Sequence, residues 1–185
     1  MAVAFVLVAI LVALLVFVGW LFNRMVRLRN EADTGWANID VQLKRRNDLI
    51  PNIVETVKGY AAHERGTFEA VTQARAAVAR AQSPAAAGEA DGLLTAAIGR
   101  LFAVAEAYPE LKASENFLQL QNELSATEDK IAAARRYYNA TVLRFNNAIR
   151  TFPAVLLARA FGFARREFFA AAAGERELPA VSFQS

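Results

Sequence analysis

The sequence predicts an all-α protein in which an N-terminal membrane-spanning helix continues into a helical domain. Two observations carry this prediction. Residues 2–22 form an apolar run without one ionisable or amide side chain. Beyond it, apolar residues recur at spacings of three and four, and one long stretch keeps a seven-residue repeat. Both patterns are typical of helices that pack one face against partners.

Residues 2–22 are long enough to cross a bilayer. A helix of this length covers ~31 Å, about the thickness of the hydrocarbon core. A secretory signal would have a shorter apolar region further from Met1, and a buried core helix is rarely apolar on every side. Because basic residues follow the run, we expect the N-terminus outside and the body in the cytoplasm. The expected membrane-interface residues are Trp20, Phe22, Arg24, Arg27 and Arg29.

Composition limits what the rest of the chain can be. After the span, roughly 160 residues remain, enough for one compact domain. The chain has no cysteine, which excludes disulfides and thiolate chemistry. Its net charge is only +3, with both signs mixed along the chain. We therefore expect no nucleic-acid partner, since such proteins concentrate basic residues on one surface, while contact with anionic membrane lipid is compatible with this charge.

The first helix is expected to continue from the span to about Asn47, because apolar residues follow a helical stripe there. Pro51 then leaves two interpretations open. It either kinks one long helix or lies in the first turn of a new helix with Asp48 as N-cap. A seven-residue phase that continues across the proline favours the kink. The next helix is predicted to end at about Gln82.

A turn at Ser83-Pro84 extending to Gly88 is predicted to precede the third helix, which would end at Tyr108-Pro109. The fourth and longest helix is expected from Ser114 to Pro153. A heptad repeat of large residues runs through it and predicts a seam packed at a shallow left-handed angle, as in bundles and coiled coils. The residues of this predicted helix-packing seam are Phe117, Leu124, Ile131, Tyr138, Phe145 and Phe152.

The tail differs in character from the helices. We divide the chain into a transmembrane helix at residues 2–22, a helical bundle at 23–153 and an aromatic and basic tail at 154–185. Phenylalanines interleaved with arginines are typical of an interfacial segment, but they would equally suit packing on the bundle or on another subunit. The chain closes on residues 179–183, which we expect to be extended. The candidates for lipid or subunit contact are Arg159, Phe161, Phe163, Arg165, Arg166, Phe168 and Phe169.

Three basic clusters stand at residues 44–46, 135–136 and 165–166. We expect them on solvated helix faces, paired with acids such as Glu128 and Asp129. The alternative is contact with anionic headgroups, which fits best for the cluster in the tail.

No pattern in the chain predicts catalysis. The lone histidine, His63, precedes Glu64, but Thr67 stands where a zinc-protease helix needs its second histidine. Phosphate loops, dinucleotide fingerprints and nucleophile elbows are not found in the sequence. We therefore expect no enzyme activity, no metal and no cofactor.

Several long blocks of the chain resemble the LemA family of bacterial membrane proteins. The first runs from Asn38 to Tyr60 and contains Lys44-Arg45-Arg46 and Leu49-Ile50-Pro51. The second runs from Pro109 to Leu120. The shorter matching blocks are Arg135-Arg136-Tyr137-Tyr138-Asn139, Thr151-Phe152-Pro153 and Phe161-Gly162-Phe163. The chain departs from the family at Thr34-Gly35 and at Asn47, where relatives often have histidine.

The resemblance implies an N-terminal anchor in the bacterial inner (plasma) membrane followed by an antiparallel four-helix bundle. It brings no catalytic residues. A helix that turned at Pro51 would stand only ~37 Å tall beside a fourth helix of ~57 Å. If Pro51 were instead a kink, residues 23–82 and 89–150 would form two arms of an extended helical hairpin, which is the alternative architecture.

The resemblance also bears on function, because relatives in magnetosome-forming bacteria are tied to building an internal membrane. We therefore expect a single-pass scaffold that self-associates as a homo-oligomer and organises or shapes the membrane. The alternative is a sensor or adaptor that relays a signal through the anchor to a soluble partner. A hydrolase is the least favoured reading, because no nucleophile, metal set or carboxylate pair is recognisable.

Overall fold

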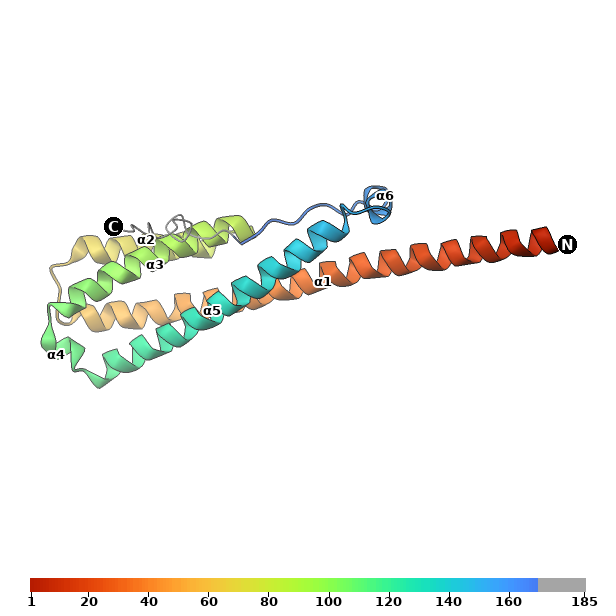
Figure 1. The fold of residues 1–185 in the computed structure, drawn as a ribbon. Coiled ribbons are helices and arrows are strands. Elements are labelled where there is room, and N and C mark those ends of the chain that lie inside the picture. Colours follow the sequence, from red (N-terminus) through yellow and green to blue (C-terminus); the bar gives the residue numbers. More distant parts are fainter. Residues whose placement is uncertain (170–185) are drawn as a thin grey trace, which may run out of the picture.

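The computed structural model describes residues 1–169, and these confirm the all-α class (Figure 1). Residues 1–169 contain no strand. The predicted extended segment at residues 179–183 lies outside the described residues. The helices are α1 (Ala2–Lys58), α2 (Arg65–Arg80), α3 (Pro84–Glu106), α4 (Pro109–Lys112), α5 (Glu115–Ala148) and α6 (Ala154–Ala160).

α1 is one helix of 57 residues that projects far beyond the rest of the molecule at its N-terminal end (Figure 1). Its most apolar stretch is wholly unburied in the molecule, with side chains such as Phe5 and Leu15 exposed. By length and composition, α1 is the one helix among residues 1–169 that could span a membrane. The predicted continuity between the span and the following helix is therefore present in the structure.

α1 passes through Pro51 and ends at Lys58. The favoured interpretation, one helix that continues through Pro51, is confirmed, and no new helix begins there. Its predicted end at Gln82 is wrong, because the helix ends at Lys58. Apolar residues on both sides of the proline, including Ile50 and Ile53, are buried in the same core. Since tertiary packing supplies most of a helix's stability in a protein, this shared core stabilises the helix across the missing N–H of Pro51. The extended hairpin is not adopted.

α2 and α3 form a helical hairpin beside α1. Ser83 is the N-cap of α3, and its hydroxyl accepts from the N–H of Ala86 at 3.2 Å. Pro84 occupies the first turn, where its missing N–H costs nothing. α3 therefore begins before the expected turn ends, and Gly88 is buried within it.

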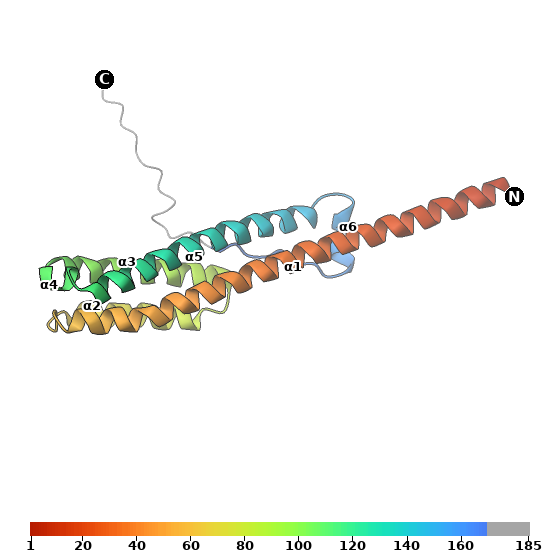
Figure 2. The same ribbon diagram turned by 90° about the horizontal axis from the view of Figure 1, so that it is seen from below.

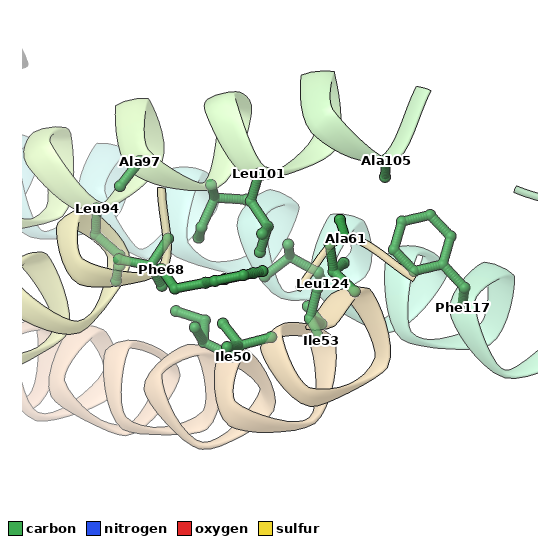
Figure 3. Packing of buried hydrophobic residues seen from close by; sticks show 14 of the residues in the cluster. Ile50, Ile53, Ala61, Phe68, Leu94, Ala97, Leu101, Ala105, Phe117 and Leu124 are labelled. Carbon is green, nitrogen blue, oxygen red and sulfur yellow. The ribbon is translucent and has the colours of Figure 1, made fainter. Parts of the chain in front are cut away.

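The four long helices make an antiparallel bundle in which α1 packs mainly on α5, and α2 mainly on α3 (Figures 1 and 2). Their apolar faces meet in one cluster at the end distant from the N-terminus. Figure 3 shows Phe68 of α2 lying between Ile50 of α1 and Leu101 of α3. Each large side chain buried in this way contributes roughly 1.5–3 kcal/mol relative to an exposed one.

The heptad side chains of α5 from Phe117 to Phe145 are buried against the other helices. Phe152 is the exception. It is 76% exposed and lies beyond the end of α5 at Ala148, so its inclusion in the seam is wrong. The helix ends one turn before the repeat does, because the chain turns aside over residues 149–153.

The helix lengths remove the predicted mismatch in height. Residues 23–58 of α1 cover ~54 Å, and α5 covers ~51 Å. After α5, the chain reverses and α6 packs beside α1. The chain turns at residues 161–162, and residues 163–169 then run back along α1 and α5 without regular secondary structure; we call residues 161–169 the strap (Figure 2).

Candidate membrane-interface site

The bundle closes around α1 at the point where the bare apolar helix begins. Leu21 and Met25 of α1 are buried in a cluster with Phe145 and Ile149 of the α5 end, and Ala158 of α6. α6 is therefore held on α1 by small residues on its inner face. Because α1 is bare on the N-terminal side of this cluster, the cluster marks the last level at which the bundle surrounds it (Figure 1).

Exposed apolar and basic side chains surround this level. We call them the collar, and they come from α1, from the turn after α5, from α6 and from the first strap residue. Arg24 of the collar lies over the ring of Trp20, with its Cζ 5.6 Å from the ring centroid. This combination of exposed aromatic and cationic groups is typical of a membrane–water boundary. The collar consists of Phe17, Trp20, Arg24, Arg27, Phe152, Leu156, Arg159 and Phe161.

Not every predicted interface residue faces outward. Phe22 is half-buried, with ring centroids 5.0 Å from Phe161 and 5.8 Å from Phe163. Arg29 is exposed, but its guanidinium lies 5.7 Å from the ring centroid of Phe163. The structure thus places Trp20, Arg24 and Arg27 at the surface and uses Phe22 and Arg29 to hold the strap.

A cleft of about 620 Å³ opens in the collar between α1 and the end of α5. Phe17 and Leu21 line it from α1, and Phe152 and Pro153 line it from the turn after α5. Two arginines, Arg24 and Arg144, also line this cleft. The arrangement can accept an apolar group and an anionic group at the same time.

Two asparagines of α5 hold the strap by its backbone. Asn146 donates from Nδ2 to the carbonyl oxygen of Arg166 and accepts from the Arg166 N–H at Oδ1, both at 2.9 Å. Asn139 likewise donates from Nδ2 to the carbonyl oxygen of Phe169 at 3.1 Å and accepts from the Phe169 N–H at Oδ1 at 2.9 Å. Seven helical residues rise ~10.5 Å and three extended residues cover about 10 Å. The two spacings match, so both amide clamps close on one antiparallel strap.

Side chains of the strap add to these backbone bonds. Arg166 forms an ion pair with Asp33 of α1 at 2.6 Å. Phe169 is 1% exposed and packs beside Trp36 where the α2–α3 hairpin ends. The strap therefore covers α1 and α5 along the half of the bundle nearest the bare helix, where the α2–α3 hairpin does not extend.

Tyr138 connects the seam to the strap. Its hydroxyl donates to the carbonyl oxygen of Glu167 at 2.8 Å. Burial raises the pKa of this phenol, Arg166 opposes the rise, and the carboxylates of Glu167 and Asp33 add to it. The neutral phenol that donates this bond is therefore the favoured form in the folded protein.

The tail candidates differ in their surroundings. Phe163, Arg166 and Phe169 face the bundle of their own chain. The remaining candidates are exposed on the strap and α6. The exposed tail candidates are Arg159, Phe161, Arg165 and Phe168.

One basic cluster contains a residue that the sequence assigned to the wrong environment. Arg46 was expected on a solvated face, but it is 2% exposed. Its Nη1 donates to Asp91 of α3 at 2.5 Å, and its Nη2 donates to Glu128 of α5 at 2.8 Å and to Thr95 at 3.0 Å. Position on the α1 stripe could have revealed this, because Arg46 lies three residues after buried Leu43 and four before buried Ile50.

His63 and Asn47, which the sequence singled out, lie outside the collar. His63 is exposed in the loop between α1 and α2. Within residues 1–169, no group of three or more histidine, cysteine, aspartate or glutamate side chains is arranged to hold a metal ion. Asn47, where the resemblance predicts histidine, accepts from Nε of Arg75 at 3.2 Å and so links α1 to α2.

These features define a class of all-α proteins in which one apolar N-terminal helix continues without a break into an antiparallel bundle. A model of the LemA family matches residues 35–183. The chain therefore belongs to the LemA family.

Three relatives show the extent of the similarity. Magnetosome protein MamQ of Magnetospirillum gryphiswaldense is 27% identical, covering 80% of this chain and 64% of that protein. Magnetosome protein MamQ 2 of Paramagnetospirillum magneticum has the same identity and coverage, 27%, 80% and 64%. Protein LemA of Metamycoplasma hominis is 32% identical over 70% of this chain and 60% of its own length. The chain spans less than two thirds of the length of each of these relatives.

Proposed function

We propose that this protein is a single-pass membrane-anchored helical scaffold that self-associates and organises or shapes the membrane. The observation that carries the proposal is the sharing of one unbroken helix by the apolar N-terminal segment and the bundle. A force between bundles would pass directly into a segment embedded in lipid, with no flexible linker to absorb it. The proposal includes no catalytic step.

The collar supports membrane anchoring. If residues 2–22 fill the hydrocarbon core, the basic groups of the collar meet the headgroup region, and its aromatic groups lie at the adjoining edge of the core. The long axis of the bundle then continues the direction of α1 away from the bilayer (Figure 1). Basic residues beside the span favour a cytoplasmic bundle with the N-terminus outside, in the bacterial inner membrane.

The relatives named as magnetosome proteins support a role in membrane organisation, because 80% of this chain aligns with them. The part that aligns covers 64% of the length of these magnetosome proteins. The proposal accordingly concerns the anchored bundle that this chain contains.

Self-association can be tested in vesicles, because the chain has no cysteine of its own. Ser125→Cys places one thiol on an exposed position of α5 for donor and acceptor labels. We expect energy transfer between labelled chains that persists when lipid is added in excess and disappears when unlabelled chain competes. Transfer that falls in proportion to lipid dilution shows independent monomers and contradicts the scaffold.

The second candidate is an adaptor for a soluble partner, and the strap favours it. Asn139 and Asn146 bind the strap through its backbone, so another extended segment could make the same four hydrogen bonds. A labelled peptide with the sequence of residues 161–169 would bind the full-length chain in this case, and the double variant Asn139→Ala/Asn146→Ala would not. Failure of the peptide to bind the unmodified chain excludes exchange of the strap.

A further inference from the structure

The cleft in the collar combines an apolar wall with cationic groups. Its apolar side chains come from α1 and from the turn after α5, and include Phe17, Leu21 and Phe152. Among residues 1–169, the charged residues that line it are Arg24 and Arg144, and none of the lining residues is acidic. Such a lining favours a ligand that carries a negative charge at one end and hydrocarbon at the other.

The position of the cleft along α1 matches a lipid rather than a soluble ligand. Its lining extends from Phe17 to Leu28, ~16 Å along the helix axis. If α1 crosses the bilayer, Phe17 and Leu21 lie at the depth of the acyl chains. Arg24 then lies at the depth of the phosphates.

Both arginines line the cleft with exposed side chains. Arg24 is exposed and lies over the ring of Trp20, so an anion can approach its guanidinium from the cleft. Arg144 is 56% exposed, and its contact with Glu31 is long, at 3.4 Å. Asn147 and Thr151 add polar groups to the same wall. Guanidinium groups recognise phosphate through paired hydrogen bonds, which an ammonium group cannot form in the same way.

We propose that this cleft binds an anionic phospholipid, with the phosphate between Arg24 and Arg144 and an acyl chain against Phe17, Leu21 and Phe152. The binding rests on the proposed membrane anchoring, because only a spanning α1 brings the cleft to the lipid interface. The occupant is one lipid with a preferred composition, which distinguishes the cleft from a general attraction to a charged surface. It gives the bundle a means to gather one class of lipid around its anchor.

Trp20 lies on the wall of the cleft and reports its occupancy directly. The full-length chain would be reconstituted in phosphatidylcholine vesicles containing a small fraction of phosphatidylglycerol with brominated acyl chains, which quench nearby tryptophan. Trp36, the other tryptophan, lies ~24 Å further along α1 and supplies a constant background. We expect brominated phosphatidylglycerol to quench Trp20 at a much lower mole fraction than brominated phosphatidylcholine does.

Matched variants separate the cleft from the surface charge. Arg24→Gln and Arg144→Gln should each reduce the preference for phosphatidylglycerol about fivefold, the effect of roughly one interfacial charge. Arg136→Gln and Arg150→Gln remove the same charge from exposed positions outside the collar and the cleft, and should change this preference less than about twofold. All four side chains are exposed, and far-ultraviolet circular dichroism checks that each variant stays folded.

Two outcomes overturn the proposal. Equal losses in the two pairs of variants show a diffuse attraction to charge, and equal quenching by both lipids shows no lipid preference. Flotation of the chain with vesicles is measured in the same samples. If the chain floats with vesicles but shows no preference for phosphatidylglycerol, only the proposed lipid binding in the cleft is contradicted. If the chain does not float, the proposed membrane anchoring is contradicted as well.

Discussion

Nη1 of Arg46 lies 2.5 Å from Oδ1 of Asp91, and both side chains are buried between α1 and α3. The same guanidinium reaches Glu128 of α5 at 2.8 Å. Three helices are therefore linked through one cation in a core that is otherwise mostly apolar. Since desolvation opposes the attraction of buried charges, the network contributes little net stability while complete, but removing its cation is costly. We infer that it specifies the relative register of α1, α3 and α5.

Arg46→Ala should destabilise the protein by about 3–5 kcal/mol, because it removes the positive charge beside a buried carboxylate. The double variant Arg46→Met/Asp91→Leu should recover much of this loss, since apolar side chains of similar size replace the buried charges. Unfolding of the full-length chain in detergent, followed by circular dichroism, measures both effects. Lys44→Ala is the control. Its ion pair with Asp40 is largely exposed and contributes no more than about 1 kcal/mol.

Gly35 allows α1 and α5 to approach closely. A Cβ at this position would lie 3.3 Å from the Cα of Tyr138 and 3.4 Å from Cδ1 of Tyr137. Gly35→Val should therefore lower the free energy of unfolding by roughly 1–3 kcal/mol, the usual result of overpacking. Gly99→Ala in α3 meets no atom within 4 Å and should raise stability by up to about 1 kcal/mol through helix propensity. Equal effects of the two changes in thermal unfolding would contradict the close approach.

Asn146→Ala should release the strap near Arg166. The substitution removes both hydrogen bonds between the Asn146 side chain and the Arg166 backbone. It leaves the N–H and the carbonyl oxygen of Arg166 without their partner, at a cost of roughly 1–3 kcal/mol. Hydrogen exchange of the Arg166 amide should accelerate about 5- to 150-fold, which corresponds to that free energy. Asn146→Asp should have a smaller effect on this amide, because the carboxylate still accepts from it.

Asn122→Ala, an exposed change on α5, is the control for the strap and should leave exchange in residues 161–169 unchanged. If the Arg166 amide exchanges at the same rate in Asn146→Ala as in the unmodified chain, the strap does not depend on the asparagine clamp.

Alkaline pH should weaken the attachment of the strap through Tyr138. Burial raises the pKa of this phenol above its ordinary value of 10.0, so folding favours the neutral form. The stabilisation is fully present below pH 10 and is lost as pH rises through the raised pKa of the folded state. Tyrosinate absorbance should contain a late component that Tyr138→Phe removes. The decline of stability above pH 10 should also be shallower in this variant, and an unchanged decline contradicts the role of the phenol.

Some features of the fold follow from local patterns. The apolar run at residues 2–22 and the heptad from Phe117 to Phe145 predict helices because each needs only the sequence and helical geometry. The N-cap at Ser83 is also local, because it involves one hydroxyl and the N–H of a nearby residue. The sequence nevertheless predicts the start of this helix after Gly88. Phe152 shows the limit of pattern, because it keeps the seven-residue phase after the helix has ended.

Other features depended on contacts between residues far apart in the chain. The position of Arg46 on the α1 stripe indicates burial, but its partners Asp91 and Glu128 come from α3 and α5. Asp91 reads as an ordinary acid near a helix start until α3 is packed against α1. Asn139 and Asn146 are equally ordinary on a polar helix, and their role appears only when the chain turns at Pro153 and brings the strap back beside them.

By itself, the sequence determined that this chain is helical, that its first helix is apolar enough to span a membrane, and that the family is LemA. These properties are encoded within single segments. Tertiary structure alone decided where α1 ends, which acids pair with Arg46, that the strap lies on its own bundle, and that a cleft opens beside the bare helix. Each of these depends on contacts between residues far apart in the chain, and such contacts exist only after the helices have packed.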